Sequence, residues 1–143
     1  MDRTEIIEAL NKDLRAELSA VELYAAHALT IPEDRIAQGV RAILAVEQRH
    51  ACDLTARIRA LGGTPAEPGG HETVIGRAAG AHASTVNALR LELAEEQQAI
   101  RDYAAQIADI MDDDETVVMI EEHLIDEMQH ARWLKAQILA LSR

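Results

Sequence analysis

Aromatic residues and cysteine are scarce in this chain of 143 residues. Aromatics make up 2% of the sequence and Phe is absent, so the core must be built from aliphatic side chains. Cys52 is the only cysteine, which excludes internal disulfides and metal sites made of several cysteines. Most of the three prolines and seven glycines lie between positions 62 and 80. The rest of the chain is rich in Ala, Leu, Ile, Glu, Gln and Arg, a composition that favours long helices.

Positive charge is also in short supply, because the formal net charge is −11. Such an acidic surface repels nucleic acid and anionic lipid, so we expect neither as a partner. It suits cations, although it would equally suit plain solubility. No apolar run approaches the length of a transmembrane helix. The N-terminal stretch MDRTEIIEAL is charged and does not resemble a signal peptide, so we expect a cytoplasmic location.

Apolar residues recur at helical spacing in four segments, which predicts an all-α fold. Asp2 and Glu5 have the spacing of a capping box at the start of the first helix, and Gly62-Gly63 is expected to end the second. We therefore expect one domain, 1–143, containing a hairpin at 2–61, a crossover at 62–82 and a second hairpin at 83–141. A crossover of about twenty residues can traverse a bundle, so that the second and third helices run parallel in a four-helix bundle.

Each of the four apolar stripes is interrupted by a glutamate, and two of them also carry a histidine. A glutamate on a solvated face would need no explanation. An unpaired carboxylate inside an apolar stripe, however, costs several kcal/mol to bury. The interrupting residues are Glu17, Glu47, His50, Glu96, Glu127 and His130.

The sequence also repeats itself. ELSAVELYAA at 17–26 aligns with EQQAIRDYAA at 96–105, and EQRHACDL at 47–54 aligns with EMQHARWL at 127–134. The chain therefore reads as two related helical hairpins in tandem.

Helix geometry predicts that the four glutamates converge. Glu17 and Glu47 lie about 14 and 15 residues from the turn near Ile31-Pro32, or roughly 21 and 22 Å of helix, and so reach the same level. The same count of residues on either side of the turn at 112–114 places Glu96 and Glu127 at the same height along the bundle. A two-fold arrangement of the hairpins would then gather four carboxylates and two imidazoles at one point.

Four carboxylates and two neutral imidazoles carry a formal charge of −4, which two divalent metals would cancel. Oxygen-rich ligation with one imidazole per metal suits iron or manganese, whereas zinc prefers more N or S ligands. A Glu from each of two helices and Glu-x-x-His from each of the other two is a known dimetal constellation. The alternative is a bundle that holds no metal.

At these residues, and over all four helices, the chain resembles the ferritin-like di-iron superfamily, most closely bacterioferritin and rubrerythrin-type bundles. The resemblance implies that Glu47 and Glu127 bridge two irons, that Glu17 and Glu96 are terminal ligands, and that each histidine binds one metal. It also implies oxidation of Fe(II) by O2 or peroxide. The electron donor and final substrate stay unidentified.

Differences from these relatives shape further expectations. Bacterioferritin binds haem through a Met directly after the second-helix Glu, and Gln48 stands there, so no haem is expected. Only 13 residues follow His130, too few for the fifth helix of ferritin cages. We therefore expect a small homodimer rather than a storage shell. A non-catalytic iron chaperone or small store, and a purely structural bundle, stay as alternatives.

Several neighbouring residues are candidates for the site. Glu92 and Glu95 would be either an extra ligand or a solvated flank. The repeat selects Glu96 as the principal ligand of the third helix, whereas the resemblance to bacterioferritin would favour Glu92. Tyr24 and Tyr103 would either hydrogen-bond to the carboxylates or fill the core. His123 would either support the site or stand partly exposed.

Overall fold

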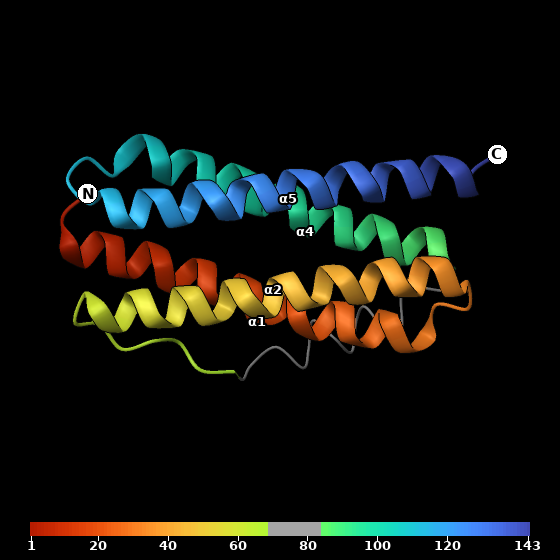
Figure 1. Ribbon diagram of the computed structural model, residues 1–143, viewed down its shortest axis with the longest axis horizontal. Helices are drawn as coiled ribbons and strands as arrows, with labels where there is room; N and C mark the ends of the chain where they lie inside the picture. The colour runs from red at the N-terminus through yellow and green to blue at the C-terminus, as the bar shows by residue number, and fades with distance from the viewer. Residues whose placement is uncertain (69–83) are drawn as a thin grey trace.

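The computed structural model describes residues 1–68 and 84–143 and contains four long helices (Figure 1). They are α1 (Arg3–Thr30), α2 (Asp34–Ala60), α4 (Thr85–Asp109) and α5 (Asp114–Leu141). The described residues include no strand. The expected all-α four-helix bundle is confirmed.

The helices pack as two antiparallel hairpins. α1 packs along α2 and α4 along α5, and the two hairpins meet where α1 contacts α4 and α2 contacts α5. Helices α2 and α4 run in the same direction, so that α2 ends and α4 begins at opposite ends of the bundle (Figure 1). This topology requires the long crossover predicted at 62–82, of which residues 69–82 lie outside the described residues.

Local sequence signals set the helix ends. Asp2 and Glu5 form the predicted capping box, with each side chain accepting from the other residue's backbone N–H. Asp113 caps α5 by accepting from the Thr116 backbone N–H. After α2, Gly62 adopts a φ of 88°, a left-handed conformation that glycine tolerates at a helix C-terminus.

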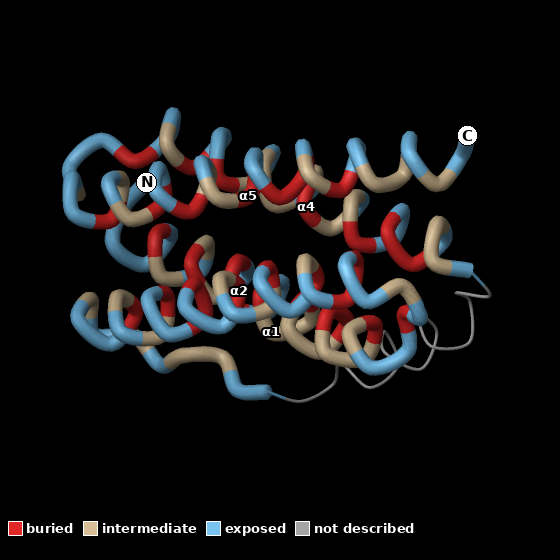
Figure 2. Tube along the Cα trace, turned by 45° about the vertical axis from the view of Figure 1, so that its right-hand side comes forward, coloured by how far each residue is buried: buried red, intermediate tan, exposed pale blue. Residues whose placement is uncertain are grey.

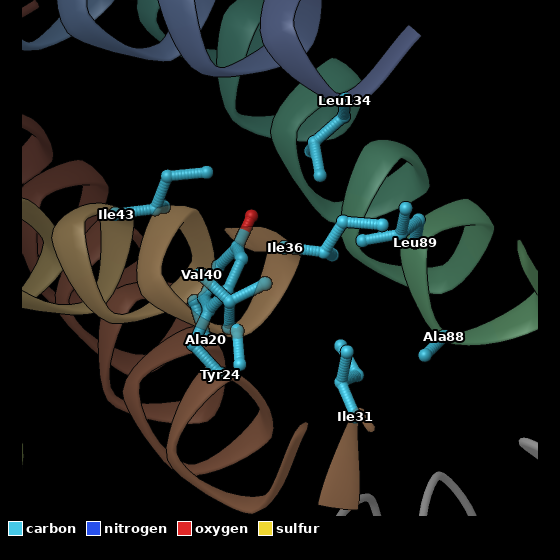
Figure 3. Close-up of a cluster of buried hydrophobic side chains, with 10 residues drawn as sticks. Ala20, Tyr24, Ile31, Ile36, Val40, Ile43, Ala88, Leu89 and Leu134 are labelled. Carbon is cyan, nitrogen blue, oxygen red and sulfur yellow. The ribbon is translucent and has the colours of Figure 1, made fainter. Parts of the chain in front are cut away.

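The aliphatic core is divided into two clusters along the bundle. Figure 2 shows that the buried positions of each helix face inward. One cluster centres on Val40, Leu89 and Leu134 and includes Tyr24 (Figure 3). The other centres on Leu10, Leu54 and Ile120. Between them every helix contributes buried charged side chains, so the candidate site lies at mid-length with an apolar layer on either side.

Candidate metal centre

The structure brings all six predicted ligands together between the two core clusters. Glu17 comes from α1, Glu47 and His50 from α2, Glu96 from α4, and Glu127 and His130 from α5. All six are buried, and even the most accessible residue, His130, is only 8% exposed. The burial of so many charged groups in one place requires a compensating charge.

The six side chains divide into two overlapping ligand groups. Glu17, Glu47, His50 and Glu127 form one group, and Glu47, Glu96, Glu127 and His130 form the other. Within each group the candidate ligand atoms all lie within 4.8 Å of one another. Glu47 and Glu127 belong to both groups, which is the arrangement that two bridging carboxylates between adjacent metals would need.

Each of the two imidazoles lies close to both shared carboxylates. Nδ1 of His50 lies 3.2 Å from Oε1 of Glu127 and 3.6 Å from oxygens of Glu17 and Glu47. Nδ1 of His130 lies 3.1 Å from Oε1 of Glu47, 3.3 Å from Oε1 of Glu96 and 3.6 Å from Oε1 of Glu127. Each histidine thus directs the same ring nitrogen at three carboxylates.

Several of these ligand atoms lie close to one another but have no hydrogen-bond partner. Among the described residues, one oxygen of each of the four glutamates and Nδ1 of His50 are buried without a hydrogen-bond partner. Buried polar atoms are normally paired. Unpaired oxygens and a ring nitrogen that gather around a common point fit two hard or borderline divalent cations such as iron or manganese.

Without a metal, protons must neutralise this cluster. Burial, together with the nearby Glu47 carboxylate, raises the pKa of Glu17 well above its usual value, and burial does the same for Glu127. Burial alone would raise the pKa of Glu47, but hydrogen bonds from Glu17 and His130 hold it well below the usual range. Burial lowers the pKa of His130, yet hydrogen bonds with Glu47 and Glu96 raise it overall to about 9. Metal binding must therefore displace protons.

Each tyrosine holds a glutamate on the opposite hairpin. Tyr24 of α1 donates to Oε1 of Glu96 at 2.5 Å, and Tyr103 of α4 donates to Oε1 of Glu17 at 2.8 Å. Both tyrosines are buried, and the other oxygen of each glutamate has no hydrogen-bond partner. The hydroxyls thus orient one carboxylate oxygen and leave the second for a ligand, which supports the hydrogen-bonding alternative.

A further buried polar pair lies beyond each tyrosine. Glu92 of α4 lies 3.3 Å from Nδ1 of His27, and Asp13 of α1 accepts from Nε2 of Gln106 at 2.8 Å. Glu92 is fully buried, so it does not lie on a solvated flank, and it belongs to neither ligand group, whereas Glu96 belongs to one. Sequence reasoning missed His27, Asp13 and Gln106, because the register between α1 and α4 that pairs them is known only from structural contacts such as Tyr103–Glu17.

A second set of polar pairs links α2 to α5. Nε2 of His50 lies 2.8 Å from Oδ2 of Asp126, and Nε2 of His123 lies 3.1 Å from Oδ2 of Asp53. His123 is 2% exposed, and its ring stacks on that of His50 with the centroids 3.9 Å apart. These contacts favour the alternative in which His123 supports the site over the one in which it is partly exposed. Asp53 is exposed and Asp126 is partly exposed, and both were missed because carboxylates at such helix positions carry no signal in the sequence.

Glu95 stands at a small opening between α1 and α4 that leads to the ligands. The opening is lined by the alanines Ala16, Ala20 and Ala99 and by Glu95, and it reaches four of the predicted ligand glutamates. Its volume of about 20 Å³ is enough for a single molecule about the size of water. Glu95 is only partly buried and belongs to neither ligand group.

Replacing Asp13 with asparagine should stabilise the metal-free protein at neutral pH. Burial raises the pKa of Asp13 from 3.8 to about 7, so the folded state binds more protons than the unfolded state between these values. Stability contributed by the protonated group is present below pH 4 and is lost as the pH rises to about 7, a loss of at most about 4 kcal/mol. Asp13→Asn should remove this loss, with a gain in unfolding free energy at pH 8 and little gain at pH 4.

Urea unfolding of the chelator-treated protein across this pH range measures the effect. The exposed Asp112→Asn variant is the matched control. A gain of equal size at both pH values, or a loss at pH 8, would show that Asp13 is not a neutral buried acid in the folded protein.

A family model for the ferritin-like domain matches residues 7–143. The chain belongs to the ferritin-like domain family. Its resemblance to the di-iron superfamily, inferred from the Glu and Glu-x-x-His pattern, is therefore confirmed. Among curated proteins no match was found.

Solved structures with the same fold include di-iron and bacterioferritin-type proteins. A ferritin-like, diiron-carboxylate protein from Bacillus anthracis str. Ames is 26% identical, with a TM-score of 0.79 and coverage of 96% of this chain and 99% of that one. A bacterioferritin from Rhodobacter capsulatus, described with a metal-free dinuclear site and haem iron, is 27% identical, with a TM-score of 0.77 and coverage of 100% and 88%. A bacterioferritin-related dodecameric thioferritin from Bacteroides fragilis shares the fold at 21% identity, with a TM-score of 0.85 and coverage of 100% and 89%.

Within residues 1–68 and 84–143, none of the helices has a stretch both long and apolar enough to cross a bilayer.

Proposed function

We propose that this protein binds two iron ions per chain and oxidises Fe(II), with O2 or peroxide as the electron acceptor. The observation that carries the proposal is the pair of ligand groups that share Glu47 and Glu127. Two metals held by common carboxylates lie close together, so two electrons can leave for one acceptor molecule. Manganese in one or both positions would satisfy the same donor set.

The roles of the side chains follow from their contacts. Glu47 and Glu127 would bridge the ions, Glu17 and Glu96 would each complete one position, and His50 and His130 would supply one nitrogen each. Tyr24 and Tyr103 fix the terminal carboxylates by hydrogen bonds at 2.5 and 2.8 Å. The apolar layers on either side exclude bulk water, which strengthens the electrostatic attraction for cations.

The reaction balances with the small reactants that the opening can admit. Two Fe(II) ions give up two electrons, and one O2 takes these and two protons to become peroxide. When peroxide is the acceptor, its O–O bond breaks and the same electrons and protons yield two water molecules. The opening of about 20 Å³ beside Glu95 supports reactants of this size rather than an organic substrate.

The test is repeated oxidation of Fe(II) by the purified protein. Aliquots of two Fe(II) per chain are added in the presence of O2 or peroxide, and residual Fe(II) is measured with a chelator while ferric absorbance is followed in the near ultraviolet. We expect fast oxidation on each addition by the wild type and by the exposed-site control Glu121→Ala. Oxidation at the buffer rate in the wild type, or an unchanged rate in Glu47→Ala/Glu127→Ala, would refute the proposal.

The net charge of −11 favours a second candidate, a carrier or small store that binds Fe(II) without turnover. An acidic surface concentrates cations around the protein. In the same experiment a carrier would oxidise or sequester the first aliquot and leave later aliquots at the buffer rate, because its two positions stay filled.

Three further proposals concern the context of the site. Gln48 occupies the exposed position of α2 directly after Glu47, where bacterioferritin has the methionine that binds haem. We therefore propose no haem there, unlike the Rhodobacter capsulatus protein described with haem iron. We propose a homodimer, although the Bacteroides fragilis relative is a dodecamer. We propose a cytoplasmic location, which the free and exposed thiol of Cys52 favours.

A further inference from the structure

The two candidate metal positions have matching ligands but different surroundings. His50 is held from two sides: Asp126 contacts its Nε2 at 2.8 Å, and His123 stacks on its ring with an interplanar angle of 23°. His123 is in turn anchored by Asp53, 3.1 Å from its Nε2. Arg49 lies 3.5 Å from the same Asp126 oxygen that contacts His50.

The residues that would provide the same support to His130 are apolar. In the alignment of EQRHACDL with EMQHARWL, Val46 stands where Asp126 stands, just before the ligand glutamate, and Trp133 stands where Asp53 stands. Ile43 corresponds to His123, one turn earlier, and belongs to the apolar core. Among the described residues, no carboxylate contacts Nε2 of His130.

Accessibility differs in the same direction. The side chain of His50 is fully buried, whereas that of His130 is 10% exposed. The better-supported histidine is therefore also the one that solvent cannot reach. These observations are independent, since one concerns hydrogen bonds and stacking and the other concerns contact with water.

We propose that the two metal positions are inequivalent, with a tightly held metal at Glu17 and His50 and an exchangeable metal at Glu96 and His130. The inference rests on the dimetal site proposed above. Asp126 accepts the proton of Nε2, which fixes the tautomer that directs the Nδ1 lone pair at the metal and raises the basicity of the ring. Stacking on His123 restricts rotation of that ring. His130 has neither constraint, so the ion that it binds exchanges more readily with the solution.

Asp126 is thus a positioning residue that acts through His50. Loss of such an outer partner commonly costs 10–100-fold in metal affinity. The test is calorimetric titration of the metal-free wild type with Co(II) under argon, where we expect a tight step followed by a weaker one. His50→Ala should remove the tight step and His130→Ala the weak step, which assigns each step to its position.

Substitution of Asp126 then tests whether its contact with His50 causes the tighter binding. Asp126→Ala should weaken the tight step by roughly 10–100-fold and leave the weak step unchanged, and Asp126→Asn, which keeps a hydrogen-bond acceptor, should recover part of that loss. Val46→Asp supplies the missing carboxylate near His130 and should tighten the weak step. Glu121→Gln on the exposed face of α5 is the control, and circular dichroism of each metal-free variant establishes that it is folded.

The outcomes separate this inference from the proposed function. Two equal steps in the wild type, or an equal loss from both steps in Asp126→Ala, would overturn the inference even if the protein oxidises Fe(II). Two unequal steps in a protein that does not oxidise Fe(II) would support the inference and refute the oxidase. Absence of metal binding by the wild type would overturn both.

Discussion

Replacing Glu47 with alanine should abolish binding at both metal positions, whereas replacing Glu17 should abolish it at only one. Glu47 belongs to both ligand groups, and its removal takes one of the two shared carboxylates away from each position. Glu17 belongs to one group only. Metal content after dialysis against Mn(II) should therefore fall from about two per chain to about zero in Glu47→Ala and to about one in Glu17→Ala.

Plasma emission spectrometry of the dialysed proteins provides the count. The exposed Glu121→Ala variant controls for general loss of negative charge on the bundle. Retention of about one metal by Glu47→Ala would mean that the positions do not share this carboxylate. Equal losses in Glu17→Ala and Glu47→Ala would point to a single mononuclear site.

Saturation with Mn(II) should raise the thermal unfolding midpoint of the wild type by roughly 15–30 °C. A ligand that binds only the folded state at a thousand times its Kd contributes about 4 kcal/mol, so two positions contribute about 8 kcal/mol. For a chain of this size about 1 kcal/mol corresponds to roughly 2–4 °C. The metals also replace protons in the buried cluster, where burial raises the pKa of Glu17 and Glu127.

This stabilisation should depend on pH with a defined sign. Protons compete with metal for the carboxylates and for His130, whose pKa in the metal-free protein is raised to about 9. The midpoint shift should therefore grow from pH 6 to pH 9. Differential scanning calorimetry with and without Mn(II) measures it, and Glu47→Ala should show almost no shift. A shift of similar size in that variant would place the stabilising metal elsewhere.

The fold and the ligand set were predictable because burial of charge is improbable without a cause. Glu17, Glu47, Glu96 and Glu127 interrupt apolar stripes at helical spacing, and the turn positions level them along the bundle. The structure places the four carboxylates and both histidines together, although their role as ligands stays a prediction. The repeat also selected Glu96 over Glu92, and Glu96 is the one found in a ligand group.

The supporting residues could not be found in the same way. Asp126 is partly exposed and Asp53 is exposed, and a carboxylate is ordinary at such helix positions. Only the interhelical register reveals that each meets a buried histidine. His27 was missed because its partner, Glu92, was considered either as a ligand or as a solvated residue. The pairing depends on how closely α1 and α4 approach, which helical periodicity alone does not determine.

The most direct test of the dimetal centre is an anomalous diffraction map of crystals of the Mn(II)-loaded protein. We predict two peaks per chain between Glu47 and Glu127, one beside His50 and one beside His130. A single peak, or peaks only among surface carboxylates, would contradict a centre bridged by these two glutamates.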